Sequence, residues 1–337
     1  MKEAELWEPL PGGGARCLLC ARGCAVKEGA RGFCRVRELK GGRLYSLNYG
    51  YDGALNLDPV EKKPLYHFLP GTLTFSVGAP GCSFDCLGCQ NSSLSRPDES
   101  WPGAGARRAD PGGLARAALE TGAKSLSFTY SEPTVFFEYA RDVGEAAAAL
   151  GLPSVWVTNG FMGRKVLEAV APHVRAMNID LKGFTDSFYR EVAKGRLAPV
   201  LDSISGAREL GIWVEATTLL IPGLNDSDSE LAGLAGFLAA LDPHLPWHIS
   251  RFSPMRLQSH LSPTEPKDLE RAREIGLAQG LRHVYIGNAR GSGYADTLCP
   301  GCGEPVVSRD GFAVFRDALG ADGKCPFCGA RVAGVWA

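Results

Sequence analysis

The sequence lacks a basic, apolar leader at its start, and none of its hydrophobic runs is long enough to span a bilayer. It also lacks an excess of charge of either sign, because the formal net charge is only −1 over 337 residues. A near-neutral chain has no overall attraction to nucleic acid or to anionic membranes. We therefore expect a cytoplasmic protein with no membrane partner and no nucleic-acid partner.

Cysteine is the residue that the sequence has in unusual number, with eleven in total. The cytoplasm keeps thiols reduced, so a set this large indicates metal sites rather than disulfides. Along the chain the cysteines fall into groups of four, three and four. Four thiolates can saturate a metal site unaided, whereas three cannot. The middle group is therefore the expected coordinatively open site.

The middle group follows an apolar, β-branched run at residues 73–77, which predicts a buried strand. Cys82, Cys86 and Cys89 come next, in a Gly- and Pro-rich segment with the spacing CxxxCxxC, so they lie on a loop at the carboxyl end of that strand. A [4Fe–4S] cube usually takes four cysteines, so three leave one iron without a protein ligand. A zinc knuckle is the alternative, although structural zinc usually takes four protein ligands.

From residue 73 onward, strand-like runs alternate with helical stretches, as in βα units that build a parallel sheet. The expected strands span residues 73–77, 125–130, 154–158, 176–181, 212–219, 247–252 and 283–286, and the clearest helices span 114–119 and 135–150. Ligand sites in such folds gather at the carboxyl ends of the strands. Polar residues at those ends are therefore the candidates for the site.

The cysteine loop resembles that of the radical S-adenosylmethionine (SAM) superfamily. The resemblance implies a partial, open parallel β/α barrel and a catalytic [4Fe–4S] cluster on Cys82, Cys86 and Cys89. In that superfamily the amino and carboxylate groups of SAM chelate the open iron, and reductive cleavage yields methionine and a 5′-deoxyadenosyl radical. The backbone between the last two cysteines, at Leu87 and Gly88, is implied to meet the adenine.

Further motifs resemble the pyruvate formate-lyase activating enzyme branch of that superfamily. Tyr-Ser-Glu-Pro-Thr after the second strand matches in position a Gly-Gly-Glu-Pro element, with Tyr130 and Ser131 in place of the glycines. The same stretch would also serve as a helix start. Thr-Asn-Gly, Asp-Leu-Lys and Leu-Pro-x-His follow on later strands, and a lysine suits the methionyl carboxylate. The implied SAM contacts are Leu87, Gly88, Ser131, Glu132, Asn159, Asp180, Lys182 and His248.

Two four-cysteine modules flank the predicted barrel. The N-terminal module is too short to bury a useful core, so a metal is expected to order it, and zinc and an auxiliary iron–sulfur cluster both fit its ligands. A basic run around this module, which includes Arg37, is expected to be a solvated face. The C-terminal module has two CxxC knuckles, typical of a zinc ribbon, with a mononuclear iron as the alternative. The ligands are Cys17, Cys20, Cys24 and Cys34 in the first, and Cys299, Cys302, Cys325 and Cys328 in the second.

The order of these motifs resembles the AmmeMemoRadiSam system radical SAM enzymes. The predicted regions are a metal module at 1–45, a connecting hairpin at 46–71, the partial barrel at 72–296 and the ribbon at 297–337. The resemblance implies an oxidoreductase with a one-electron donor, Memo-type and AMMECR-type partner proteins, and hydrogen abstraction from an unidentified substrate, a protein being one option. Radical oxidation or rearrangement of a small molecule with an auxiliary cluster is one alternative, and a zinc-ribbon binding scaffold is another.

Overall fold

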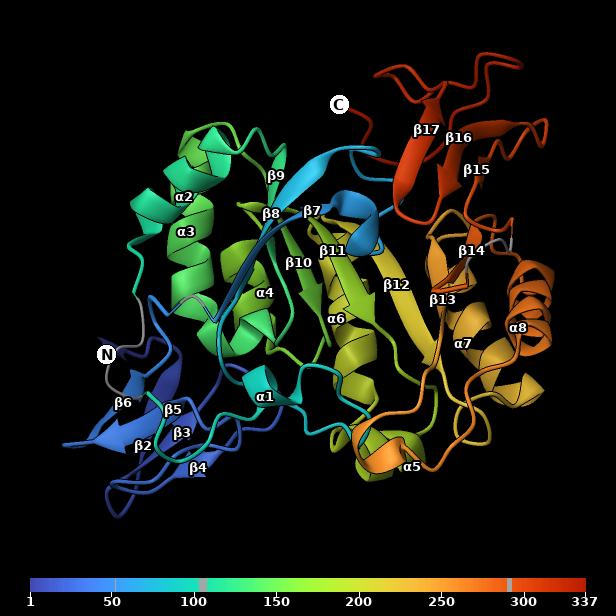
Figure 1. Ribbon diagram of the computed structural model, residues 1–337. Helices are drawn as coiled ribbons and strands as arrows, with labels where there is room; N and C mark the ends of the chain where they lie inside the picture. The colour runs from blue at the N-terminus through green and yellow to red at the C-terminus, as the bar shows by residue number, and fades with distance from the viewer. Residues whose placement is uncertain (52, 103–107, 290–292) are drawn as a thin grey trace.

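The computed structural model describes residues 1–51, 53–102, 108–289 and 293–337. An eight-stranded sheet forms the centre of the fold (Figure 1). The strand order is β14-β13-β12-β11-β10-β9-β8-β7. Neighbours from β8 to β14 are parallel, and β7 joins β8 antiparallel. The strands are β7 Ala54–Pro59, β8 Leu73–Gly78, β9 Ser125–Phe128, β10 Ser154–Thr158, β11 Val174–Asp180, β12 Trp213–Leu220, β13 Trp247–Arg251 and β14 Val284–Gly287. The predicted α/β class is confirmed. Within the described residues no ladder joins β14 to β7, so the sheet is open.

Helices follow the strands in the alternation that the sequence predicts. They are α1 Ser92–Ser95, α2 Pro111–Glu120, α3 Phe137–Ala149, α4 Arg164–Val170, α5 Asp186–Phe188, α6 Ala198–Glu209, α7 Asp228–Leu241 and α8 Pro266–Ala278. The start of α2 shows why these boundaries form, since the Asp110 side chain accepts from Gly113 N and Pro111 occupies the first helical position. None of the helices among the described residues is long and apolar enough to cross a membrane.

The N-terminal region forms two small sheets, β2-β3-β4 and β1-β6-β5, beside the main sheet (Figure 1). Their strands are β1 Lys2–Glu3, β2 Trp7–Leu10, β3 Gly14–Cys17, β4 Ala25–Val26, β5 Arg37–Lys40 and β6 Arg43–Ser46. The expected connecting hairpin at 46–71 does not form, because β6 pairs with β5 and β1 while β7 pairs with β8. Between them, the buried Asn48 side chain donates to Pro80 O and Val135 O, which directs the chain onward to the large sheet.

The C-terminal residues form an antiparallel three-stranded sheet of β15 Thr297–Leu298, β16 Pro305–Asp310 and β17 Ala313–Asp317. This ribbon and the N-terminal sheets lie at opposite ends of the main strands (Figure 1). The ribbon contacts the segment that precedes β8, through a bridge between Phe68 and Val335 and a hydrogen bond from Arg309 Nη2 to Tyr66 O. The ribbon therefore lies against the amino ends of the strands, away from the cysteine loop.

Candidate active site

The loop of Cys82, Cys86 and Cys89 follows β8, as the sequence predicts. Its backbone is fixed by hydrogen bonds from Leu87 N to Val192 O (3.1 Å) and from Asp85 N to Ala193 O (3.3 Å). All three thiols are partly buried, and the other eight cysteines belong to the two flanking groups. Among the described residues the loop therefore offers three thiolates and no fourth. This donor set fits a [4Fe–4S] cluster with one iron left open.

Asn159, in the loop that follows β10, lies directly beside Cys82. Its Nδ2 donates to Cys82 Sγ (3.6 Å) and to Ser83 Oγ (3.0 Å). Phe84 N also donates to Cys82 Sγ (3.4 Å). Donors aimed at a sulfur favour its anionic form, the form that binds metal. Burial and the neighbouring Glu132 carboxylate act the other way and raise the pKa of the free Cys82 thiol well above its usual value.

Glu132 is buried beside Cys82 and Asn159, and its carboxylate accepts hydrogen bonds from groups of the protein itself. It accepts from Thr134 N, Thr134 Oγ1, Thr158 Oγ1 (2.7 Å) and Asn159 N (2.8 Å), and it caps the 3₁₀ helix Pro133–Phe136. The helix-start interpretation of this stretch is therefore confirmed. Glu132 holds the Asn159 backbone, while its contact with SAM stays a prediction.

Tyr130 stands where the resemblance places a glycine, and its backbone has φ of 68°. This left-handed region is costly for a bulky side chain, which is the physical reason for glycine there in the family motif. The cost is offset by bonds on both sides of the residue. The Tyr130 hydroxyl donates to Asp58, and the Tyr130 carbonyl accepts from Asn91 Nδ2 (2.8 Å). Ser131 Oγ donates to Ala79 O, so this predicted SAM residue binds the start of the cysteine loop.

Asp180 and Lys182, at the end of β11, form an ion pair of 2.7 Å between Nζ and Oδ2. Burial disfavours the ammonium, but Asp180 and Cys86 outweigh it and raise the pKa of Lys182 above its usual value. The pair thus lies near Cys86, as the sequence predicts, and Lys182 is charged. A fixed cation at this edge suits an anionic group such as a carboxylate.

His248 is on the same face of the sheet as Asp180, since the register pairs Asp180 with Thr217 and Thr217 with His248. Its ring, however, is bonded through Nε2 to Glu215 (2.6 Å) and packs against Tyr66 and Tyr285. The structure therefore does not bring His248 to the cysteine loop, and its role in binding SAM stays a prediction. His67 is buried, and its Nε2 is bonded to the Tyr285 hydroxyl (2.6 Å).

The segment after β13 adds two residues, Arg256 and Gln258, that no sequence motif identifies. Arg256 Nη1 donates to Cys86 O (2.6 Å). A Cβ on Gly88 would lie 2.2 Å from Gln258 Oε1, so the end of the Gln258 side chain packs directly against Gly88 and would have to shift to admit a Cβ. Gln258 is 2% exposed, and its Nε2 has no hydrogen-bond partner among the described residues. An unpaired buried amide is costly, which makes Gln258 Nε2 a candidate donor to a polar ligand.

The ribbon cysteines converge on a single point. The four sulfurs of Cys299, Cys302, Cys325 and Cys328 all lie within 4.8 Å of one another. Two pairs are 3.6 and 3.7 Å apart. A tetrahedral ion with sulfurs at about 2.3 Å requires a separation of about 3.8 Å. The expected mononuclear site is therefore present, and its geometry suits zinc or a single iron.

Replacing the buried Cys325 by alanine is expected to remove the ribbon metal, because three thiolates and a void cannot close a structural site. Elemental analysis should show one metal ion fewer per chain. Limited proteolysis should cut the ribbon while the main sheet stays resistant, since the two pack as separate cores. A ribbon as resistant to protease in the metal-free variant as in the native chain would contradict a structural metal.

The comparisons with known proteins come from both sequence and structure. Residues 76–235 match the model of the Radical SAM superfamily. An uncharacterized protein of Methanocaldococcus jannaschii is 40% identical over 335 residues, which are 98% of this chain and 99% of that one. A radical SAM methyltransferase of Sphaerobacter thermophilus is similar with a TM-score of 0.52 and 17% identity, covering 70% of this chain and 71% of the other. SuiB of Streptococcus suis bound to S-adenosylmethionine is similar with a TM-score of 0.50 and 16% identity, over 68% of this chain and 53% of SuiB.

Proposed function

We propose that this chain, which carries a Radical SAM superfamily domain at residues 76–235, is an enzyme that cleaves SAM reductively at a [4Fe–4S] cluster held by Cys82, Cys86 and Cys89. The observation that carries the proposal is the loop with three thiols and no fourth, bordered by Asn159 and Lys182. When bound there, the cluster supplies the electron that splits SAM into methionine and a 5′-deoxyadenosyl radical.

Different residues around the loop bind different parts of SAM. Lys182 pairs with the methionyl carboxylate, and Asp180 orients the Lys182 ammonium. Gln258, whose Nε2 has no partner among the described residues and whose Oε1 faces Gly88, donates to the adenine through Nε2. The Asn159 side-chain amide donates to Cys82 Sγ and so positions it, and the Glu132 carboxylate positions Asn159 by accepting from its backbone N–H. Each role uses a contact or an unpaired group of the chain itself.

The finer assignment rests on motif resemblance. We place the chain with the AmmeMemoRadiSam system enzymes and the activating-enzyme relatives, acting as an oxidoreductase on a protein side chain or glycine backbone. Memo-type and AMMECR-type proteins are the proposed partners, with a one-electron donor as reductant. Pull-down from an anaerobic mixture of purified chains would test each partner, and a tagged chain that retains neither would count against this assignment.

The reaction itself is tested by chromatography. The full chain is reconstituted anaerobically with iron and sulfide, reduced with dithionite and given SAM, and 5′-deoxyadenosine is measured. We expect product that depends on dithionite. A chain that holds four irons and four sulfides at the loop and yet forms no product above the protein-free background would overturn the proposed reaction.

Replacing Lys182 by methionine is expected to raise the KM for SAM roughly 10- to 100-fold, since a hydrogen bond to a charged group contributes about 1.5–3 kcal/mol. Methionine keeps most of the length of the side chain and removes the ammonium, with its charge and its hydrogen-bond donors. The exposed Lys267 on α8 offers the matched control, and Lys267→Met should leave KM unchanged. Equal KM values for the Lys182→Met variant and the native chain would show that Lys182 does not bind the carboxylate.

A further inference from the structure

The N-terminal cysteines are arranged differently from those of the ribbon, although both groups have four. Among the described residues, the ribbon is the one place where three or more metal-type ligand atoms gather within 4.8 Å of one another. Cys17, Cys20, Cys24 and Cys34 do not meet that spacing and instead line a common cavity. Ligands of a single tetrahedral ion would lie about 3.8 Å apart. The wider N-terminal set therefore does not fit one ion.

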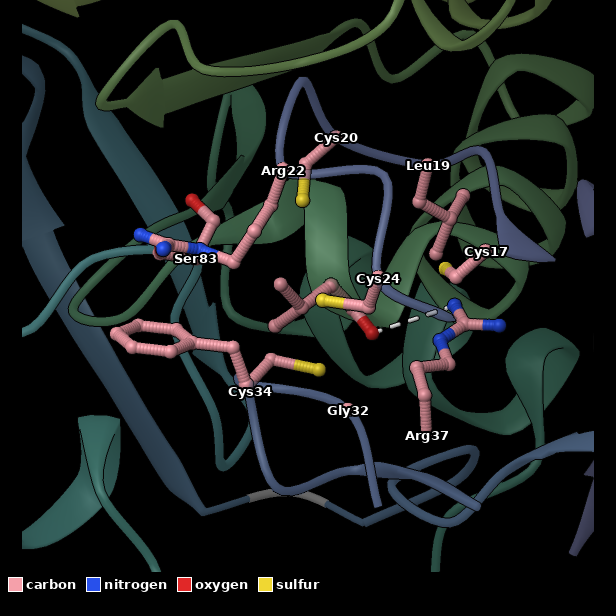
Figure 2. Close-up of a pocket in the computed structure, with 11 residues that line it drawn as sticks. Cys17, Leu19, Cys20, Arg22, Cys24, Gly32, Cys34, Arg37 and Ser83 are labelled. Carbon is pink, nitrogen blue, oxygen red and sulfur yellow. Dashed lines mark hydrogen bonds between the residues drawn. The ribbon is translucent and has the colours of Figure 1, made fainter. Parts of the chain in front are cut away.

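The four thiols share one cavity, which is partly open to solvent. Figure 2 shows the sulfurs of Cys20, Cys24 and Cys34 turned toward the same space, with Cys17 approaching from the side of Arg37. Leu19, Phe33 and Val135 form the apolar part of the remaining wall, and Arg22, Arg37 and Ser83 form its polar part.

Two loops carry the thiols around this cavity, and backbone hydrogen bonds hold them. Cys17 N donates to Cys24 O (2.9 Å), and Gly23 N donates to Cys20 O (3.1 Å), which closes the first loop. Cys20 is bridged to Met162, in the loop after β10, so the first loop is anchored to the main sheet. Cys34 comes from a separate turn. The spacing of the sulfurs is thus set by hydrogen-bonded backbone.

Arg37 provides an independent sign of a ligand in this cavity. Its side chain is 1% exposed, and its Nε–H is buried and has no partner among the described residues. The same side chain lines the cavity beside the four thiols. A buried charged donor without an acceptor is costly, and thiolate or inorganic sulfide would supply one. The guanidinium is already paired with Glu138, so Arg37 offers the cavity a hydrogen-bond donor rather than net charge.

The cavity adjoins the Cys82 loop. Arg22 lines it and donates to Ser83 O through both Nη2 (2.9 Å) and Nε (3.3 Å). A Cβ on Gly81 would lie 3.1 Å from Cys34 O, and Gly81 has φ of 107°, so glycine permits this close approach. On the other side of the loop, Arg96 Nη1 donates to Phe33 O (2.8 Å). The two cysteine loops therefore pack backbone to backbone.

We propose that Cys17, Cys20, Cys24 and Cys34 hold a second iron–sulfur cluster, packed against the loop that holds the first. Four protein thiolates leave no iron open, so this cluster binds no substrate and is confined to accepting and donating single electrons. The cluster on the adjoining Cys82 loop is the group with which it would exchange electrons. The inference stands on the N-terminal geometry and is independent of the proposed reaction.

The test counts inorganic sulfide, which an iron–sulfur cluster contains and a zinc or single-iron site does not. The full chain with Cys82→Ala, Cys86→Ala and Cys89→Ala together is reconstituted anaerobically. We expect about four irons and four sulfides per chain to remain, with the paramagnetic resonance signal of a reduced cluster after dithionite. The double variant Cys20→Ala and Cys24→Ala in the native background should lose the same amount. The matched double variant Cys302→Ala and Cys328→Ala, in the ribbon, should keep all of its sulfide.

The outcomes separate this inference from the proposed function. A native chain with four sulfides that all disappear in the triple loop variant, with zinc bound in the N-terminal module, overturns the second cluster and leaves the proposed reaction intact. A native chain whose four sulfides all persist in the triple variant supports the second cluster and overturns the first. A native chain with eight sulfides, which fall to four in the triple loop variant and also in the Cys20→Ala and Cys24→Ala double variant, supports both clusters.

Discussion

Alanine in place of Cys86 is expected to reduce the formation of 5′-deoxyadenosine to the background of the protein-free reaction. Two thiolates cannot hold the cube, and without it SAM has no open iron at which to bind and be cleaved. The fold should survive, because the loop is fixed by its backbone. Arg256 still donates to the carbonyl of residue 86, and Leu87 N still donates to Val192 O.

Three measurements on the Cys86→Ala variant distinguish the loss of catalytic activity from unfolding of the protein. Inorganic sulfide should fall by about four per chain relative to the native protein. The metal of the ribbon should remain at its native amount, since its ligands lie at the opposite end of the strands. The circular dichroism spectrum should be unchanged. Native levels of product from a variant with this loss of sulfide would place the reactive cluster elsewhere.

The sequence predicted the parts of this fold that depend on local pattern. Every strand expected from residue 73 onward is present, and β10 has the predicted limits, because buried parallel strands appear as short apolar runs between turn signals. The cysteine loop, Asn159 and the Asp180–Lys182 pair meet at one edge because all follow the carboxyl ends of neighbouring parallel strands. A topological rule was enough to bring them together.

The residues that the sequence did not reveal depend on partners far along the chain. Arg37 was expected on a solvated face, which is wrong, since its partner Glu138 is 101 residues away on α3. Gln258 reaches Gly88 through an irregular segment with no periodic signal. The strand β7 was assigned to a hairpin because the alternation of apolar and polar residues predicts a strand but does not show which strand it pairs with. Pairings of this kind are set by packing, which local patterns do not encode.

Leucine in place of Glu138 is expected to lower the free energy of unfolding by about 3–5 kcal/mol, because it leaves a buried guanidinium without its counter-ion. Arg37 is 1% and Glu138 0% exposed, and the two are joined by two hydrogen bonds, one of them 2.6 Å. Glu138 also accepts from Glu5 N (3.1 Å), so its carboxylate connects the N-terminal sheets to α3. The free energy is measured by urea titration of circular dichroism.

The double variant Arg37→Met and Glu138→Leu should recover much of this loss, since apolar side chains of similar volume remove the unpaired charge. The exposed pair of Arg43 and Glu3 offers a matched comparison in the same sheets, and Arg43→Met should leave the unfolding midpoint unchanged. If the double variant were as unstable as Glu138→Leu alone, the cost would come from lost packing around α3 rather than from the buried charge. In that case the attachment of the N-terminal module would be apolar in origin, and the ion pair would serve only to orient Arg37 toward the cysteines.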